Sequence, residues 1–530
     1  DGACAAKWEK MSESGLGLGS LIMWANDDDP AGKRAYTNGT NGHSKKDNML
    51  VKTHPQVEKP IGTAEPTTEI DVTKYRAEDG GILDAWVDCY SNKWIFATGN
   101  DRWHYWNGTC WQPDDRLIIQ REVRELLDTI NQRCSQYIIE ASKQTGRPTD
   151  TESNTNIEIV KAMRKASKRT NGRISSIEGM ARSVNTKPIS AFDMQDSINL
   201  INGTLNLHSL ELQPHSRDDL FTYQLDYQYD PNAKCPQWEK YISEVLVKDG
   251  TLETDTDLVS LFQELLGYSL TTQTKRQVMI WMYGDGGNGK SVAVDAVQAL
   301  LGPMATTVDF QSIGLPGNYD LADIPGKRVI FSTEAEKGGA VSEKHIKCIV
   351  TGDPLKARPI YGSPIEFRST AKIWWAMNDR PIVKDTSDSM WRRMKLIPFL
   401  RKFEEGKNAD VDLPQKLRTE LPGILNWAIQ GLIRLTLNDG FTYSEAAESA
   451  KLQYREESNP VARWVNTMTV RTEYPATLQG ALFDNFKGWL SAENEKPITS
   501  NQFGRDLGRL KISKTRRDKG FMYHLALIGD

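Results

Sequence analysis

The chain has 530 residues, a hydrophobic content of 38% and a formal net charge of −4. A single hydrophobic core stops growing well below this length, so we expect several domains. No stretch reaches the ~20 consecutive apolar residues of a membrane-spanning helix, and no signal peptide is recognisable, so we expect a cytoplasmic protein without a membrane partner. Because the chain is slightly acidic, any contact with nucleic acid must come from local basic surfaces.

Cysteine and histidine usage argues against two further classes of protein. The six cysteines are widely scattered without a C-x-x-C pair, and the chain has only seven histidines. This pattern argues against a zinc module and against a disulfide framework. Reduced cysteines packed inside a cytosolic fold are the favoured interpretation.

The first part of the chain changes composition several times. It opens on Asp1 rather than methionine, so we expect a piece of a longer protein, and residues 8–24 read as one short ordered segment. Residues 27–72 are rich in Gly, Asn, Asp, Lys and Pro, which predicts a linker. Residues 73–113 hold five tryptophans in short β-like runs, which favour a packed β meander over exposed rings that stack bases.

Helical spacing dominates residues 116–186. The basic cluster between residues 164 and 169 is interpreted as a solvated helix face rather than a DNA contact. Further on, Asn202-Gly203 between two alternating runs predicts a β-hairpin. His208 and His215 lack the carboxylates and the spacing of a metal site, so we interpret both as ordinary polar residues.

Residues 276–301 combine a buried strand, a glycine-rich turn and a helix. The run 278–283 is apolar and unbroken, as expected of a strand buried on both faces. The octet after it fits G-x-x-x-x-G-K-[ST], whose curled backbone directs successive N–H groups at a phosphate. Its residues are Gly284, Asp285, Gly286, Gly287, Asn288, Gly289, Lys290 and Ser291. We expect Lys290 to reach the β and γ phosphates of ATP, and the Ser291 hydroxyl to bind Mg²⁺ at the start of the helix.

Two acidic residues follow a second apolar run, 329–331. An ATPase needs one carboxylate to hold Mg²⁺ through water and a second to orient the attacking water. We assign Glu334 to the first role and Glu336 to the second. Solvated strand caps are the alternative interpretation.

Two more polar positions complete the predicted catalytic set. The apolar run 373–377 ends at Asn378, whose amide can hydrogen-bond the γ-phosphate or the lytic water. Arg392 and Arg393 precede a final strand, and one of them could reach across a subunit boundary as an arginine finger. Surface salt bridges are the alternative for the two arginines.

The C-terminal part predicts helices and then a basic unit. Residues 412–457 read as helices, and two further helices and a hairpin after Pro460 suggest a winged helix. Residues 500–530 hold seven basic against three acidic residues, as expected of a phosphate-binding surface. A winged helix that binds protein is the alternative. We assign DNA contacts to Arg505, Arg509, Lys514, Arg516 and Arg517.

This order of motifs resembles the superfamily 3 helicases, and more closely the helicase half of the primase-helicases of phages, satellite phages, plasmids and poxviruses. The residues that carry the resemblance are GDGGNGKS, VIFSTEAE, VTGDPLKARPIYGSPIEF, IWWAMNDRP and WRRMKLIPF, about 120 residues in all. The stretch from INGTLNLHS to NAKCPQW resembles the domain that precedes the motor in that family. The opening WEKMSESGLGLGSLIMW resembles the end of a primase C-terminal element.

The resemblance implies an α/β fold, with an AAA+ type P-loop ATPase core, an N-terminal α+β helicase-associated domain and a C-terminal winged helix. The expected segments are 1–26, the end of a primase element; 27–72, the linker; 73–240, the helicase-associated domain; 241–458, the ATPase domain with its closing helices; and 459–530, the winged-helix-like basic domain.

The resemblance also implies a ring, most often a hexamer, that moves along single-stranded DNA in the 3′ to 5′ direction, with a primase module upstream in the full-length chain. A hairpin within residues 340–367 is expected to line the pore, so DNA contacts are carried onto Lys356, Arg358 and Tyr361. Two basic residues and one aromatic residue suit a loop that grips phosphates and stacks a base, and a purely structural hairpin is the alternative.

One departure from the family pattern affects the acidic motif. Many members have two adjacent acids there, whereas Ala335 separates Glu334 and Glu336 in this chain. The division of labour between the two carboxylates therefore stays open.

These expectations converge on a DNA helicase that uses ATP and Mg²⁺ on single-stranded or forked DNA. It would act in the replication of a phage, prophage or plasmid, in the cytoplasm of a bacterial host. The alternative is an origin-binding initiator in which ATP only switches assembly. A primase is not supported, because the sequence holds neither a polymerase-type carboxylate cluster nor a zinc ribbon.

Overall fold

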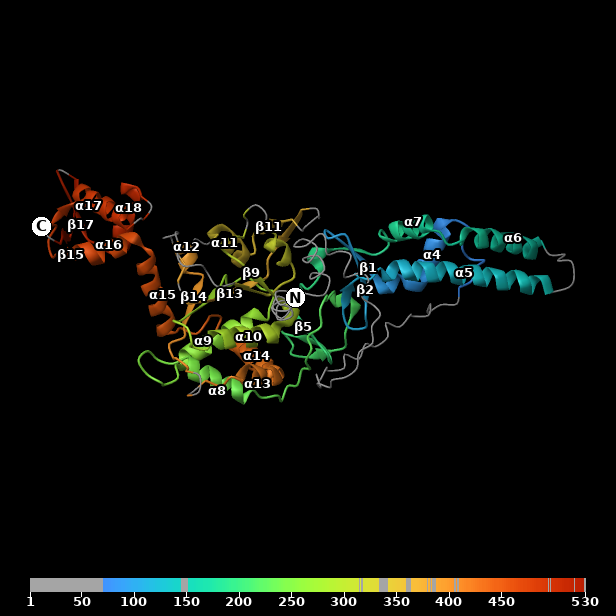
Figure 1. The fold of residues 1–530 in the computed structure, drawn as a ribbon, viewed down its shortest axis with the longest axis horizontal. Helices are drawn as coiled ribbons and strands as arrows, with labels where there is room; N and C mark the ends of the chain where they lie inside the picture. Colours follow the sequence, from blue (N-terminus) through green and yellow to red (C-terminus); the bar gives the residue numbers. More distant parts are fainter. Residues whose placement is uncertain are drawn as a thin grey trace, which may run out of the picture. The chain divides into compact units, whose positions relative to one another are not determined.

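The computed structural model describes residues 70–528 with several interruptions, and Figure 1 labels its elements. These residues belong to the unit Pro66–Asp530, one of two into which the chain divides; the segments expected over 1–26 and 27–69 lie outside them. Ile70 and Val72, at the end of the expected linker, are buried. The interruptions are 144–150, 314, 316–317, 333–341, 359–363, 379, 382, 384–387, 405–406, 408, 494, 496 and 519, together with the side chains of 151–154.

The N-terminal region packs a helix against a small sheet with the strand order β3-β2-β1-β4. The expected meander is present as β1, β2 and β3, but residues 79–90 form helix α4, so the prediction of β-like runs was wrong there. Ile82, Ala85 and Trp86 are buried at helical spacing, and Trp86 meets Trp103 of the sheet edge-on, with 6.3 Å between ring centroids. The elements are α4 (Asp79–Tyr90), β1 (Trp94–Thr98), β2 (Arg102–Trp106), β3 (Trp111–Pro113) and β4 (Thr186–Pro188).

The helices predicted over 116–186 are confirmed as α5 (Ile118–Lys143), α6 (Thr151–Ala166) and α7 (Asn171–Ala181). An apolar stripe along α5, which includes Val123 and Ile130, faces the N-terminal core. Short 3₁₀ turns also occur in the described chain: η1 (Ser91–Lys93), η2 (Ile189–Ala191), η3 (Arg217–Asp219), η4 (Gly302–Met304) and η5 (Asp320–Asp323).

A second small sheet follows, and it confirms the predicted hairpin. β5 (Ser197–Leu200), β6 (Gly203–Asn206) and β7 (Leu212–Gln213) are antiparallel neighbours. Gly203 has a φ of +144°, and a Cβ there would lie 2.4 Å from the carbonyl oxygen of Gln213. Only glycine therefore fits at this turn.

The central sheet has five strands that all run parallel, in the order β14-β8-β13-β10-β9. The apolar runs predicted as strands at 278–283, 329–331 and 373–377 are confirmed, and so is an α/β fold with a parallel sheet. Because the strands are parallel, all their carboxyl ends meet at one edge and all their amino ends at the other. The strands are β8 (Met279–Tyr283), β9 (Ala305–Val308), β10 (Val329–Ser332), β13 (Lys372–Met377) and β14 (Met394–Pro398).

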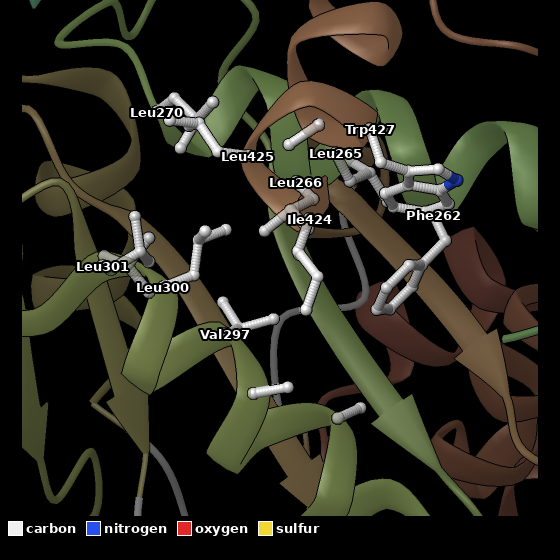
Figure 2. Packing of buried hydrophobic residues seen from close by; sticks show 14 of the residues in the cluster. Phe262, Leu265, Leu266, Leu270, Val297, Leu300, Leu301, Ile424, Leu425 and Trp427 are labelled. Atoms are coloured by element: carbon white, nitrogen blue, oxygen red, sulfur yellow. The ribbon is translucent and has the colours of Figure 1, made fainter. Parts of the chain in front are cut away.

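Helices bury both faces of the central sheet. Along β8, Ile280 and Met282 join the core formed with α9, α10 and α14, whereas Met279 and Trp281 join the core formed with α11 and α15. Figure 2 shows the first core, in which residues of α9, α10 and α14 converge. The helices are α8 (Pro236–Val245), α9 (Thr256–Ser269), α10 (Lys290–Leu301), α11 (Glu343–Thr351), α12 (Asp388–Trp391), α13 (Leu413–Thr419), α14 (Leu421–Leu437) and α15 (Glu445–Ser458).

The C-terminal region packs three helices and small strands around Trp464, Phe486 and Phe503. The two predicted helices and the predicted hairpin are present as α17, α18 and β17-β18, and Thr499 is the N-cap of α18. The elements are α16 (Pro460–Met468), β15 (Thr469–Arg471), β16 (Thr477–Leu478), α17 (Gln479–Ala492), α18 (Ser500–Arg509), β17 (Lys514–Arg517), β18 (Gly520–Tyr523) and β19 (Leu525–Leu527).

Two buried cations lie at the amino edge of the central sheet. Arg328, just before β10, donates to the carbonyl oxygens of Gln195 at 2.7 Å and Ser197 at 2.5 Å, and so ties β10 to the small sheet. Lys372, the first residue of β13, donates to the carbonyl oxygen of Thr271 at 2.5 Å. Burial lowers the pKa of Lys372 well below its ordinary value, and nearby Arg328 lowers it further.

Within the described ranges, no helix combines the length and apolar character needed to cross a bilayer.

Candidate nucleotide-binding site

The glycine-rich octet joins the end of β8 to the start of α10 at the carboxyl edge of the central sheet. Lys290 is the first residue of α10, and Gly289, at its N-cap, has a φ of +87°. Gly286 and Gly287 also have positive φ angles, +92° and +62°. Residues with a Cβ rarely adopt such angles, and a run of them lets successive N–H groups face one anion at the positive end of a helix.

Close packing inside the turn explains its first glycine. A Cβ on Gly284 would lie 1.8 Å from the Asn288 amide nitrogen and 2.5 Å from the carbonyl oxygen of Phe399. Asn288 is 3% exposed, and its amide donates to that same Phe399 oxygen at 2.9 Å. The side chain of Asn288 therefore holds the turn against the chain that leaves β14.

Lys290 lies inside the turn and not in solvent. It is 6% exposed, and its Nζ donates to the carbonyl oxygen of Gly284 at 2.6 Å and to Asn288 Oδ1 at 2.8 Å. Both acceptors are neutral, whereas phosphate oxygens carry charge and form stronger hydrogen bonds with an ammonium group. The exposed Ser291 follows in the first turn of α10, and the exposed Asp285 accepts a hydrogen bond from the Tyr283 hydroxyl at 3.3 Å.

Segments far away in the sequence support the turn, and sequence reasoning missed them. Tyr241, on α8, donates its hydroxyl to the carbonyl oxygen of Gly289 at 2.7 Å, and burial raises the pKa of this phenol. The backbone N–H of Phe403 donates to the carbonyl oxygen of Gly287 at 2.7 Å. No local pattern could have identified either residue, because each is far from its partner in sequence, by 48 positions for Tyr241 and Gly289. The boundary expected at 240/241 falls inside α8.

Asn378 lies where predicted, directly after β13 and beside the turn. β13 is the neighbour of β8, and Met377 pairs with Tyr283. Two residues later, the guanidinium of Arg380 lies 4.0 Å from the ring centroid of Tyr283 and pairs with Glu457 at 2.6 Å. Sequence reasoning did not single out Arg380, although its distance of two residues from Asn378 was a usable signal.

The predicted carboxylates Glu334 and Glu336 lie outside the described residues. β10, which precedes them, ends at Ser332 and is separated from β8 by β13. The Ser332 hydroxyl oxygen is buried and has no hydrogen-bond partner among the described residues. This buried polar atom lies at the same edge of the sheet as the turn.

Arg392 and Arg393 lie at the opposite, amino edge of the sheet. The Met279 N–H at the start of β8 donates to the carbonyl oxygen of Arg393 at 2.8 Å. The five residues of β8, at about 3.3 Å per residue, then separate this point from the turn, so neither arginine reaches the turn of its own chain. Arg392 is exposed, whereas Arg393 donates to the Ser389 hydroxyl at 2.9 Å and has a pKa lowered by burial.

The residues assigned to DNA contacts lie on two hairpins and on helix α18. Lys356 and Arg358 are exposed on β11 (Pro354–Ala357) and just after it, alternating with buried Leu355; β11 pairs with β12 (Ile365–Arg368), and Tyr361 lies outside the described residues. In the C-terminal region, the exposed basic residues are Arg505 and Arg509 of α18 and Lys514, Arg516 and Arg517 of β17.

The chemistry of the turn fits a magnesium-bound triphosphate. The turn supplies curled backbone at a helix N-terminus, a buried ammonium group and an exposed hydroxyl. Within the described ranges, no three His, Cys, Asp or Glu side chains gather as a metal cage. Among the described residues, Ser291 would hold a magnesium ion here together with phosphate oxygens and water, a pattern this ion prefers with nucleotides. Glu334, the carboxylate expected to assist, lies outside the described residues.

Two known families match parts of the chain. Residues 84–247 match the family described as D5 N terminal like, and residues 282–393, from the end of β8 to Arg393, match a family of unknown function, DUF5906. Among solved structures, the apo C-terminal region of NrS-1 matches 84% of this chain and 98% of its own length, with 10% sequence identity to this chain. Its TM-score of 0.44 does not establish a shared fold.

Viral proteins are similar to this chain over longer stretches. "Putative helicase L207/L206" of Acanthamoeba polyphaga mimivirus is 23% identical over 74% of this chain and 43% of its own length. "Putative helicase 121R" of Invertebrate iridescent virus 3 is 21% identical over 98% of this chain and 61% of its own length. The chain thus spans about half of the length of these relatives. Together, the family matches and the viral relatives show that the chain is similar, over these stretches, to primase-helicase-like proteins of the phage and viral type.

Proposed function

We propose that the chain is an ATP-driven, magnesium-dependent DNA helicase motor that acts in the replication of a phage, prophage, virus or plasmid. The observation that carries this proposal is Lys290, held inside a glycine turn at the N-terminus of α10. The turn lies at the carboxyl edge of a parallel sheet, where α/β proteins bind their ligands. The names of the viral relatives support the same activity.

Each residue of the turn has a distinct part in this proposal. Bound Mg²⁺-ATP supplies the phosphoryl group whose transfer to water releases energy for movement. The backbone of 284–289 surrounds the phosphates, and Lys290 exchanges its two carbonyl acceptors for phosphate oxygens. Ser291 holds the magnesium ion, and Asn378 orients the γ-phosphate or the lytic water. Glu334 and Glu336 remain our candidates for the magnesium-associated carboxylate and the base.

The proposal includes an AAA+ type ring, most often a hexamer, that moves 3′ to 5′ on single-stranded DNA. The position of the arginines supports assembly, because Arg392 and Arg393 lie at the edge of the sheet opposite the turn of their own chain. An arginine finger from this pair must therefore act on the nucleotide of a second copy. Arg392 is the better candidate, because it is exposed whereas Arg393 is bonded to Ser389.

DNA contact in this proposal rests on exposed basic residues of two hairpins. Lys356 and Arg358 project from one side of β11, while Leu355 on the other side is buried. In the C-terminal region, Arg516 and Arg517 pair with Phe521 and Gly520 across the β17-β18 hairpin. Exposed cations of this kind bind phosphates in a salt-dependent manner.

The test is ATP turnover by the chain and by Lys290→Ala, with Lys161→Ala as the control. Loss of the ammonium group should lower the turnover by at least about 100-fold, because the β and γ phosphates lose their point charge. Lys161, an exposed lysine of α6, should be replaceable without effect. Undiminished turnover in Lys290→Ala would refute the assignment of the site.

A strand-displacement assay separates the motor from the initiator that the sequence left open. A helicase should displace a strand from a fork without any origin sequence, in step with ATP hydrolysis. Binding without displacement would favour an initiator in which ATP only switches assembly.

A further inference from the structure

A second basic site lies at the amino edge of the central sheet, opposite the glycine turn. It is a pocket of about 380 Å³, which we call the basic pocket. Three separate segments line it: the turn before β8, the start of β14, and the loop after α14. The lining residues are Lys275, Arg276, Gln277, Val278, Arg392, Arg393, Lys395, Asp439, Gly440 and Phe441.

The charge of the basic pocket is not balanced by its own residues. Five of its side chains are cationic and one, Asp439, is acidic. Asp439 is already paired with Arg276 at 3.1 Å and is otherwise exposed. Lys275 and Arg392 have no ion-pair partner among the residues that the structure describes, and both are exposed toward solvent. An anion is therefore the missing partner.

Two of the cations, Arg393 and Lys395, have pKa values lowered by burial, so their charged forms are disfavoured in the pocket. Burial lowers the pKa of Arg393, and the charge of Arg392 lowers it further; the Nε of Arg393 is buried without a partner among the described residues. Burial also lowers the pKa of Lys395, whose ammonium lies 3.9 Å from Glu448. The charges of the adjacent Arg392 and Arg393 repel each other, and a bound anion would relieve this repulsion.

Two turns with unusual backbone angles form part of the wall of the basic pocket. Gln277 and Asp439 both have left-handed φ angles, +45° and +47°, which residues other than glycine rarely adopt. The turn at Gln277 is closed by its N–H, which donates to the carbonyl oxygen of Thr274 at 2.9 Å. Arg276 then fixes the opposite loop by donating to the carbonyl oxygen of Asp439 at 3.1 Å. The pocket is thus a built feature of two tied turns.

Its lining suits a phosphate group, and its size suits a ligand larger than a simple inorganic anion. Guanidinium groups form forked hydrogen bonds with phosphate, and lysines add point charges. Phe441 forms one wall, with Arg276 at 5.8 Å and Lys395 at 5.7 Å from its ring centroid. The volume lies in the range of small-molecule sites, so the pocket has room for more than one phosphate.

We propose that the basic pocket is a second phosphate-binding site of this chain, which takes the polyphosphate end of a nucleotide. Lys275, Arg276 and Lys395 are phosphate-binding residues in it, beside the two arginines. The nucleotide can come free from solution or be held by the glycine turn of a second copy. Only the second source rests on the proposed function.

The test uses the unmodified chain and inorganic pyrophosphate as the probe. Lysines are acetylated with an N-hydroxysuccinimide ester and read by mass spectrometry, with sodium chloride added to the control at the same ionic strength. Pyrophosphate at twice its Kd should slow the acetylation of Lys275 by about threefold, as mass action requires, and leave Lys161 unchanged. Lys290→Ala should show the same protection, because its basic pocket is intact. Equal rates at Lys275 with and without millimolar pyrophosphate would overturn the proposal.

A variant tests whether Lys395 contributes to the same site. Lys395→Gln shortens the side chain by one atom and removes its charge, while a polar group stays beside Phe441. It should weaken the protection of Lys275 several-fold, whereas Lys161→Gln should not. Unchanged protection in Lys395→Gln would also count against the pocket.

Two further arms identify the source of the nucleotide. With Mg²⁺ and a non-hydrolysable ATP analogue, a free nucleotide should protect Lys275 in wild type and in Lys290→Ala alike. A nucleotide delivered by a second copy should protect Lys290→Ala chains only after they are mixed with wild type. If ATP turnover is absent but pyrophosphate protects, the proposed function fails and the pocket stands; if turnover is present without protection, only the pocket fails.

Discussion

The two edges of the central sheet differ in how their cationic side chains are placed: one is buried at the carboxyl edge, and several line an open pocket at the amino edge. At the carboxyl edge, backbone and one buried lysine form the glycine turn, and neutral carbonyl oxygens of Gly284 and Asn288 satisfy that lysine. At the amino edge, five cationic side chains surround an open pocket with one carboxylate among them. The first site is preorganised by packing, and the second is held together by side-chain charge.

Because of this difference, ligand binding at the two edges should respond to different perturbations. A backbone cradle changes little with salt but fails when its packing changes, because close-packed groups cannot move aside. A cluster of exposed charges responds to ionic strength and to single charge removals. Substitutions that disturb packing should therefore act most strongly at the carboxyl edge.

The largest effect is expected from Gly284→Val. Its Cβ would start 1.8 Å from the Asn288 amide nitrogen, so the turn must open. We expect the affinity for an ATP analogue to fall by at least about 100-fold, because the phosphate cradle is lost. Fluorescence titration measures this, with Gly179→Ala as the control, since nothing lies within 4 Å of a Cβ there. Near-normal affinity in Gly284→Val would mean that the turn is not the binding site.

A smaller effect is expected from Asn288→Ala. This change removes the hydrogen bond to Phe399 and one acceptor of Lys290, Asn288 Oδ1. Loss of a buried hydrogen-bond network costs about 1–3 kcal/mol, so ATP turnover should fall by about fivefold to 150-fold. Steady-state kinetics at saturating ATP measures it. A variant with normal turnover would show that the tie to the chain after β14 is not needed.

Tyr241→Phe should act through the same turn more weakly. It removes only the hydroxyl that donates to the carbonyl oxygen of Gly289. A net hydrogen bond of about 1 kcal/mol corresponds to a roughly fivefold loss of nucleotide affinity, seen in KM more than in kcat. Tyr443→Phe is the matched control, because Tyr443 is exposed. Equal KM values for the two variants would contradict a positioning role of Tyr241.

The last effect concerns protein stability at the amino edge and depends on pH. The pKa of buried Lys372 is far below the 10.5 of an unfolded lysine, so between these values the unfolded state binds more protons. Raising the pH through this window should therefore stabilise the wild type, by at most about 1.4 kcal/mol per pH unit from this group.

Lys372→Met should lose that contribution. Urea unfolding at pH 7.5 and 9.5 should show a smaller gain, or a larger loss, of unfolding free energy in the variant. Burial also lowers the pKa of Lys327 and Lys395, but both remain in the two proteins, so the difference isolates Lys372. Identical pH responses would mean that burial does not lower the pKa of Lys372 in the folded protein.

The sequence predicted most of the carboxyl edge because its parts are contiguous or regularly placed. The octet lies in one run, and both apolar strands beside it are buried on two faces, which leaves a continuous hydrophobic signal. Asn378 follows from the end of such a strand. By contrast, helix α4 was missed because its Trp86 was assigned to a strand, together with the strand tryptophan Trp103 that it packs against.

The amino edge could not be predicted in the same way. Lys275, Lys395 and Phe441 come from three segments that meet only after the sheet has formed with β14 beside β8. Tyr241 reaches the turn from α8 for the same reason. Sequence periodicity reports which residues are buried, but it does not report which distant turns become neighbours.

The central claim is that residues 284–291 hold the phosphates of Mg²⁺-ATP. The most direct measurement is an experimental structure of the chain with Mg²⁺ and a non-hydrolysable ATP analogue. The account predicts that the triphosphate lies in the glycine turn, with Lys290 moved from Gly284 and Asn288 onto phosphate oxygens and with the metal at Ser291. A nucleotide bound elsewhere, with Lys290 still on its two carbonyl acceptors, would contradict it.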